Sequence, residues 1–218
     1  MADFFSNQKT EAPHLTPFWY VLLLIGLASV YYTSLRFYHS TPYRKLLKYL
    51  QILQIIGLYG WYLCTLTPSA ESLPFYHCSL AALALLCLPD QSIYKSYFAL
   101  LGIIGSICSA IYPIFDPFRL PHITFISYII GHYALIGNSL VYLTLHKKPL
   151  SSKRIIYFTF QLNLIIVSIN LLTDGNYGFL SQPPIIGNHG ILFNYLFISC
   201  LLSAVLIFEN KIYQKIKE

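Results

Sequence analysis

Charged residues are scarce in this chain. Only 10% of its 218 residues are Asp, Glu, Lys or Arg, whereas 56% are hydrophobic, and the mean hydropathy is +0.58. A soluble domain usually carries about 25% charged residues, so this composition excludes an ordinary soluble protein. The few charges also gather in short groups between long apolar runs. The sequence therefore predicts a membrane protein.

Several functional classes need residues that this chain lacks. No Lys occurs within the last apolar run, 191–208, which excludes a retinal Schiff base on that helix. Asp90, Asp116 and Asp174 all fall between apolar runs, so no row of carboxylates crosses the membrane as in a proton or cation pump. The sequence contains no HExxH motif, no CxxC pair and no phosphate-binding glycine loop. We therefore predict neither a metal nor a cofactor.

What the chain does contain is a series of seven apolar runs. A hydrocarbon core of about 30 Å needs roughly 20 apolar residues of helix. Most of the runs meet that length, whereas the third and fourth are short enough to be buried or slightly re-entrant. We predict an all-α polytopic membrane protein, a bundle of about seven transmembrane helices. Its predicted spans are 17–35, 46–66, 73–88, 97–112, 123–145, 155–173 and 191–208.

The segments outside the spans set the predicted domain limits. Residues 1–16 form a polar segment that we expect to be disordered or interfacial, 17–208 form one transmembrane domain, and 209–218 form a basic tail. The polar segment lacks the basic start of a signal peptide, because Asp3 and Glu11 accompany Lys9. We therefore expect the first run to remain as an uncleaved helix.

Lys and Arg set the orientation. They gather on one side of the predicted bundle, whereas the other side has only Lys9 and Arg119. Positive charge marks the cytoplasmic side, so we predict an outer amino terminus and a cytoplasmic carboxyl terminus. The net charge of +6 then reflects topology and contact with anionic lipid, and not nucleic-acid binding. The residues of the basic side are Arg36, Arg44, Lys45, Lys48, Lys95, Lys147, Lys148, Lys153, Arg154, Lys211, Lys215 and Lys217.

Two histidines lie within the predicted spans. Ionisable groups at membrane depth are rare and suggest function. His132 lies about 13 Å past the start of its span and Cys78 about 8 Å past the start of its own, at the rise of a helix. His77 precedes Cys78, and Asn170 and Trp61 reach a similar outer level on other spans. Polar groups on several spans therefore predict a site in the outer half of the bundle.

Each of these residues also has a structural interpretation. A lone His in a helix is often satisfied by a neighbouring Ser or Tyr, and Tyr128 shares a helical face with His132. Cys78 is a candidate nucleophile with a His nearby, a disulfide partner of Cys64, or a packing residue. Asn residues such as Asn163 and Asn170 more often form hydrogen bonds between membrane helices than contact a substrate.

Four short motifs together resemble a known family. They are LPFYHC at 73–78, the loop from Asp116-Pro117 to His122, the pair Gly131-His132, and NYGFL at 176–180. In order and spacing they resemble the bacterial integral membrane proteins of the YwaF type, which are similar to the eukaryotic transmembrane protein 164 family.

The resemblance implies a function in lipid metabolism. The eukaryotic branch is implicated in acyl transfer that remodels phospholipids, including ether lipids, with a Cys that carries the acyl group. Two departures limit the comparison. The bacterial pattern has its His where this chain has Tyr76, one place before His77, and the eukaryotic Cys falls where this chain has Phe75. Cys78 therefore matches the bacterial pattern only, whereas His132 matches directly.

We therefore expect a multi-pass protein of the cell membrane that transfers acyl chains between membrane phospholipids, from a site between spans two, three, five and six. An outer site would receive phospholipid donors rather than cytoplasmic acyl-CoA. His132 is the predicted general base, with Cys78 and His77 as further catalytic candidates. The alternatives are a non-enzymatic transporter or receptor for a small hydrophobic ligand, and a purely structural subunit. The predicted substrate-binding residues are Trp61, Tyr76, Tyr128, Asn170, Asn176 and Tyr177.

Overall fold

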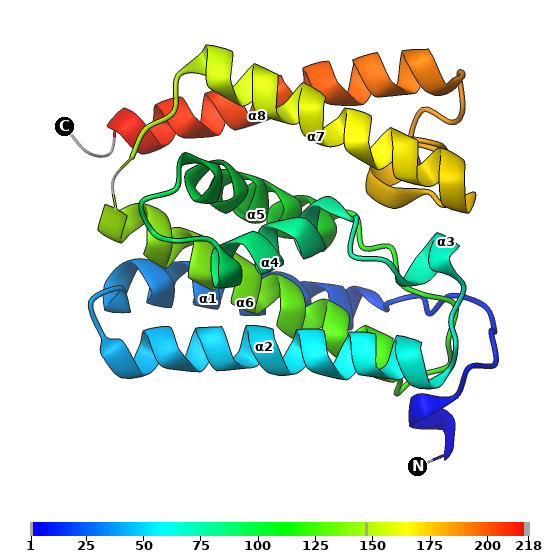
Figure 1. Cartoon of the computed structure of the whole chain (residues 1–218). Helices are drawn as coiled ribbons and strands as arrows, with labels where there is room; N and C mark the ends of the chain where they lie inside the picture. Colours follow the sequence, from blue (N-terminus) through cyan, green and yellow to red (C-terminus); the bar gives the residue numbers. More distant parts are fainter. Residues whose placement is uncertain (1, 147, 216–218) are drawn as a thin grey trace. The chain divides into compact units, whose positions relative to one another are not determined.

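The computed structural model describes residues 2–146 and 148–215, and within these ranges it contains helices and connecting segments but no strand (Figure 1). The all-α prediction is confirmed. Lys147 and Lys217, which contributed to the predicted orientation, lie outside the described residues. The elements are η1 (Ala2–Phe5), α1 (Pro17–Phe37), α2 (Thr41–Cys64), α3 (Ser69–Ser72), α4 (His77–Cys87), α5 (Ile93–Ile111), α6 (Ile123–His146), α7 (Ser152–Thr173), η2 (Tyr177–Phe179) and α8 (Ile191–Lys215).

Five of the described helices are long and apolar enough to cross a membrane: α1, α5, α6, α7 and α8. The protein is thus a multi-pass helical membrane protein. The predicted count of seven spans and the predicted orientation of the termini stay predictions. Helix α8 continues to Lys215, so most of the predicted tail extends this helix.

Two of the seven predicted spans differ from these five. Helix α2 has 24 residues, but Lys48, Gln51 and Gln54 interrupt its apolar sequence. Helix α4 has only 11 residues, which makes it about 16 Å long, roughly half of a hydrocarbon core. It begins at His77 because Pro74 and the extended backbone of Tyr76 hold the preceding residues out of the helix.

Serines mark the starts of two helices. The side chain of Ser40 accepts a hydrogen bond from the backbone N–H of Tyr43, and that of Ser151 accepts one from Arg154. Such caps satisfy N–H groups that have no partner inside the helix. Helix α7 ends at Thr173, and the next residue, Asp174, has a left-handed φ of 56° that turns the chain out of the helix.

The chain divides into two compact units. Unit 1 comprises Met1–Thr67 and Gly105–His146, and unit 2 comprises Pro68–Ile104 and Lys147–Glu218. The predicted transmembrane domain, 17–208, therefore contains parts of both units, and the first and last parts of α5 belong to different units.

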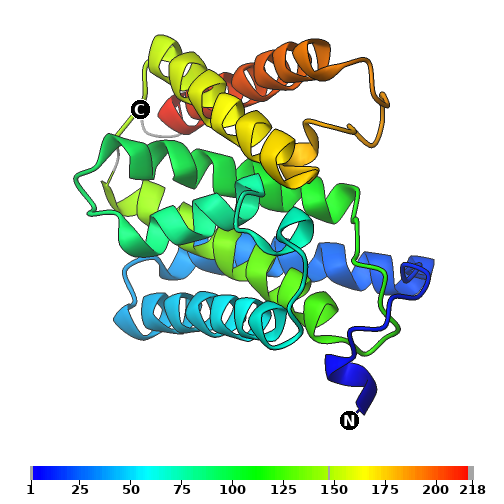
Figure 2. The ribbon, with the colours of Figure 1, turned by 45° about the vertical axis from the view of Figure 1, so that its right-hand side comes forward.

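In unit 1, α6 packs against both α1 and α2 (Figure 2). Its core contains Leu47, Leu135 and Ile136. Gly137 allows α2 to approach, because a Cβ at this position would lie 2.8 Å from a methyl group of Leu47. The close approach of these helices is therefore encoded by a small residue on α6.

In unit 2, α7 and α8 run side by side, as both views show. A buried hydrogen bond of 3.0 Å from the Tyr97 hydroxyl to Thr159 joins α5 to α7. At the end of α7, Ile166 and Val167 pack with Tyr177 and Leu180 of the following loop. This loop contains η2 and is therefore part of the core of unit 2.

The amino-terminal segment is held against unit 1 by hydrogen bonds. The Trp61 Nε1–H donates to the Phe5 carbonyl at 3.0 Å, His122 Nε2–H donates to the Ser6 carbonyl at 2.9 Å, and the Thr10 N–H donates to the Pro117 carbonyl at 2.7 Å. These hydrogen bonds hold residues 5–10 in place, and the predicted interfacial position of the segment stays a prediction. Carbonyl groups outside helices need donors, and the indole and imidazole N–H groups supply them.

Candidate functional site

His77 is held by side chains from two other helices of unit 2. Its Nε2 lies 2.7 Å from Asn163 Oδ1 on α7, and Asn163 Nδ2 donates to Ser199 Oγ on α8 at 2.9 Å. An amide oxygen only accepts, so His77 Nε2 carries the hydrogen and, in the neutral ring, Nδ1 keeps the lone pair. The structure thus fixes both the orientation and the tautomer of His77.

The backbone at Gly178 lies close against the same imidazole ring. A Cβ on Gly178 would lie 2.7 Å from His77 Cε1 and 3.1 Å from Nδ1, and its φ of 62° is left-handed. Both features favour glycine here. The NYGFL motif is therefore in direct contact with the LPFYHC motif, which begins about a hundred residues earlier in the chain.

Tyr177 ties these two motifs together further. Its side chain is fully buried, and its hydroxyl accepts from the Leu73 N–H at 2.8 Å and donates to the Ser69 carbonyl at 2.5 Å. The rings of Phe75 and Tyr76 pack edge-on against it, with centroids 6.0 Å and 5.1 Å away. Tyr76 and Tyr177 were both predicted to bind substrate. In the structure they pack against each other next to the start of α4.

Asn170 and Asn176 use their amides on the same loop. Asn170 accepts from the Tyr177 N–H at 2.8 Å and donates to the Tyr177 carbonyl at 3.0 Å. Asn176 accepts from the N–H groups of Ser181 and Gln182 and donates to the Gln182 carbonyl. These contacts favour a structural role, in which the two amides set the loop conformation that brings Gly178 to His77.

Cys78 follows His77 in the first turn of α4 and is partly buried. None of the five cysteines is in a disulfide bond, so Cys78 and Cys64 are not joined to each other in the structure. Neighbouring residues on a helix point in different directions, by about 100°, so the sequence pair does not by itself bring the thiol to the imidazole. The first turn of a helix nevertheless favours negative charge on a side chain such as a thiolate.

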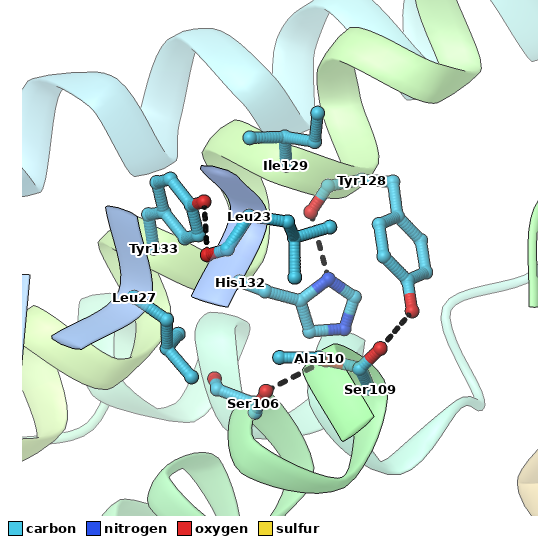
Figure 3. A pocket seen from close by; sticks show the side chains of 9 residues that line it. All are labelled: Leu23, Leu27, Ser106, Ser109, Ala110, Tyr128, Ile129, His132 and Tyr133. Atoms are coloured by element: carbon cyan, nitrogen blue, oxygen red, sulfur yellow. Dashed lines mark hydrogen bonds between the residues drawn. The ribbon is translucent and has the colours of Figure 1, made fainter. Parts of the chain in front are cut away.

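His132 lies on α6 in unit 1, where a small cavity opens beside it (Figure 3). Its Nδ1 donates to the Tyr128 carbonyl one turn earlier at 2.7 Å, so in the neutral ring Nε2 keeps the lone pair. Figure 3 shows Nε2 turned toward Ser109 and Ala110 at the end of α5. The Tyr128 hydroxyl donates to the Ser109 carbonyl at 2.7 Å.

The size of this cavity limits what it can hold. Its volume is about 10 Å³, close to the smallest space that accepts one water molecule. Apolar side chains of α1, Leu23 and Leu27, form one wall. In this conformation the cavity is too small for an acyl chain.

Trp61 also belongs to unit 1, and its side chain is only 5% exposed. Its ring packs edge-on against His122, with centroids 5.1 Å apart, and against Phe118 at 5.3 Å. Its indole N–H is already bonded to Phe5. These contacts anchor the amino-terminal segment and leave little of the ring for a ligand.

The predicted site residues thus fall into two groups. Unit 1 contains Trp61, Tyr128 and His132, and unit 2 contains the others, which are Tyr76, His77, Cys78, Asn170, Asn176 and Tyr177. A site shared by spans two, three, five and six stays a prediction. Among residues 2–146 and 148–215, no group of three His, Cys, Asp or Glu side chains could hold a metal ion.

Three residues at or near His77 were not predicted as part of a site. Asn163 was predicted to form a hydrogen bond between helices. It does so, and its partner on α4 is the imidazole of His77. Ser199 carries no sequence signal, because a Ser in an apolar helix is common. Gly178 had a usable signal, since a glycine inside a family motif indicates a close contact or a left-handed backbone.

The comparison with known families gives one match. The model of the TMEM164 family matches residues 4–209, which include most of both units and all four motifs. No curated protein and no solved structure matches the chain. Because the match extends over nearly the whole sequence, this chain belongs to the TMEM164 family.

Proposed function

We propose that this protein is a membrane-embedded acyltransferase that moves an acyl chain between membrane phospholipids, with its chemistry in unit 2 at His77 and Cys78. The observation that carries the proposal is the 2.7 Å bond between His77 Nε2 and Asn163 Oδ1. A His whose far nitrogen is fixed by an amide or carboxylate is the typical arrangement of a general base in acyl transfer.

The simplest reaction is a direct transfer. His77 Nδ1 accepts the proton of an acceptor hydroxyl while the hydroxyl oxygen attacks the ester carbonyl of a donor lipid. The new ester bond forms, the bond from the carbonyl carbon to the leaving oxygen breaks, and the imidazolium returns its proton to that oxygen. Asn163 stabilises the imidazolium because its amide oxygen accepts the Nε2–H throughout.

Cys78 offers a two-step route to the same products. Its thiolate attacks the donor ester to form a thioester on the protein and releases the donor as its alcohol after proton transfer. The acceptor hydroxyl then attacks the thioester and restores the thiol. The position of Cys78 in the first turn of α4 supports this route.

His132 is the second candidate for the base. Its Nε2 carries the lone pair and borders the small cavity of unit 1.

In the proposed topology of seven spans with an outer amino terminus, the donors are phospholipids of the outer leaflet rather than cytoplasmic acyl-CoA.

The test is comparative lipidomics by mass spectrometry. Cells that lack this protein are complemented at matched expression with wild type, His77→Gln, Cys78→Ala or His132→Ala. We expect a phospholipid species that disappears with the deletion to return with wild type and not with His77→Gln. Return with Cys78→Ala would assign the direct route, and failure with His132→Ala alone would move the base to unit 1.

A second measurement separates an enzyme from a carrier. The purified protein is mixed with a phospholipid whose acyl chain carries an isotope label and with an unlabelled lysophospholipid. An enzyme produces a labelled phospholipid with the acceptor's headgroup. Identical lipid profiles in all cells, together with no labelled product, would contradict the proposal.

A further inference from the structure

Glu209 lies on α8 just past the predicted span 191–208, and its carboxyl group is enclosed by the protein. Both of its oxygens are buried, and in the described part of the chain neither has a hydrogen-bond partner. Glu209 forms no ion pair there either. It belongs to neither of the candidate sites at His77 and His132, so its burial needs an explanation of its own.

The surroundings of this carboxyl group disfavour a negative charge. Val205 and Leu206, one turn back along α8, are apolar, and Leu206 is fully buried. An ionised carboxylate that is removed from water without a partner costs far more free energy than a neutral polar group in the same place. The form of Glu209 that fits the folded protein is therefore the neutral, protonated acid.

No other ionisable group compensates a charge on Glu209. In unit 2, α7 packs against α8, and the segment before α7 is bonded to it. None of the ionisable residues on these elements is bonded to Glu209. Because both oxygens are enclosed, a metal cation or the side chain of a partner protein does not reach them in this conformation. The ionisable residues are Lys148, Lys153, Arg154 and Tyr157 before and on α7, and Lys211, Tyr213 and Lys215 on α8.

The next residue, Asn210, fastens α8 to the segment that leads into α7. Its Nδ2 donates to the Leu150 carbonyl at 2.8 Å, and its Oδ1 accepts from the Leu150 N–H at 3.3 Å. Both side chains are buried. We call this pair of hydrogen bonds the Asn210–Leu150 clamp. It holds the chain close to the point where it leaves unit 1 at His146 and enters unit 2.

We propose that Glu209 binds a proton in the folded protein and that loss of this proton opens the Asn210–Leu150 clamp. When the proton passes to water, the carboxylate that remains requires hydration, which it obtains only if the end of α8 moves away from the residues that enclose it. Asn210 follows Glu209 directly, so this movement separates Asn210 from Leu150. The inference does not depend on the proposed acyl transfer, and His77→Gln should leave it unchanged.

The bound proton sets the sign of the pH dependence. In an unfolded chain a Glu releases its proton at about pH 4.3, whereas folded Glu209 retains it. Above that pH, and until the folded protein also releases its proton, unfolding liberates one proton. Each rise of one pH unit in this window therefore increases the equilibrium constant of unfolding about tenfold. Stability is lost as the pH rises, and Glu209→Gln, which is neutral at every pH, should lack this loss.

The first test measures the clamp by hydrogen–deuterium exchange of the full chain in lipid nanodiscs. The N–H of Leu150 belongs to the clamp, so a peptide that covers 148–154 reports its opening. Exchange rates are corrected for the intrinsic effect of pH. From about pH 5 to about pH 9 we expect the protection of this peptide to fall at least about tenfold in wild type and to stay constant in Glu209→Gln.

Two variants serve as controls. Asn210→Ala removes the clamp and should leave 148–154 weakly protected at every pH. Asp174→Asn removes an exposed carboxylate of the same unit and should follow wild type. Constant protection in wild type, or the same pH dependence in wild type and Glu209→Gln, would overturn the inference. Full protection in Asn210→Ala would contradict the clamp.

Infrared spectroscopy observes the proton itself and does not require a variant that folds. A protonated carboxyl group and a carboxylate have separate stretching bands. In wild type at neutral pH we expect a band of a protonated acid, which gives way to a carboxylate band as 148–154 loses protection. The protonated band should be missing from Glu209→Gln. A spectrum of wild type with carboxylate bands alone at neutral pH would show that Glu209 is ionised and would overturn the inference.

Discussion

His77 and His132 are both partly buried histidines on helices, but they are held by different parts of the chain. His132 bonds to a carbonyl one turn back on its own helix, a contact that any His in an α-helix can make. His77 bonds to Asn163, 86 residues away, which bonds in turn to Ser199. The first arrangement needs only a helix, whereas the second needs three helices to be packed correctly. A His fixed through tertiary contacts is the better candidate for catalysis.

The largest expected difference is between His77→Ala and His132→Ala. Loss of a general base typically lowers turnover about 10²–10⁴-fold, and we expect this loss for His77. We expect less than about tenfold for His132, because the Tyr128 carbonyl that it leaves lies within α6 and can still accept a backbone hydrogen bond there. The isotope-label transfer assay measures both. A greater loss of turnover with His132→Ala than with His77→Ala would make His132 the better candidate for the base.

Asn163→Ala comes next. It leaves His77 Nε2 and Ser199 Oγ without the partner that each has in the structure. Loss of a buried hydrogen-bond partner costs about 1–3 kcal/mol, and the unfixed ring should lower the catalytic rate with little change in KM. Thermal unfolding in detergent and the transfer assay measure the two effects. A loss of stability of the expected size with unchanged turnover would show that Asn163 has only a structural role.

Gly178→Ala tests the contact between the two motifs. Gly187 provides a control, because its φ of 73° is also left-handed but nothing lies near a Cβ built on it. Both substitutions incur about 1–2 kcal/mol for the left-handed backbone. We expect only Gly178→Ala to lower turnover as well, since its methyl group displaces the His77 ring. Equal activities of the two variants would argue against a role for that contact.

Ser199→Ala should have the smallest effect. It removes the acceptor of Asn163 Nδ2 and should cost about 0.5–1.5 kcal/mol of stability. Ser203 lies one turn further along α8, is also buried, and within the described residues its Oγ has no partner. Ser203→Ala should therefore be neutral or slightly stabilising. A larger loss of stability from Ser203→Ala, measured by thermal unfolding, would contradict the hydrogen-bond network.

Part of the fold could be predicted from the apolar runs alone. The positions of α1, α6, α7 and α8 follow their runs closely, because long apolar segments have no stable alternative to helix in a membrane. Helix α4 was predicted too long, since the hydropathy of the run does not show that the backbone of Tyr76 is extended and that the helix begins only at His77. The bonds that hold the amino-terminal segment also escaped prediction, because they depend on Trp61 and His122 being brought together.

The candidate site divides in the same way. The sequence by itself determined that the protein is helical and crosses a membrane, that it belongs to its family, and that His77, Cys78 and His132 are the residues worth testing, because hydropathy and short motifs are local properties. Only the tertiary structure decided which residues contact them. Asn163, Ser199 and Gly178 meet His77 because α4, α7, α8 and the loop after α7 pack together, and a linear sequence does not state which polar side chains will face each other across helices.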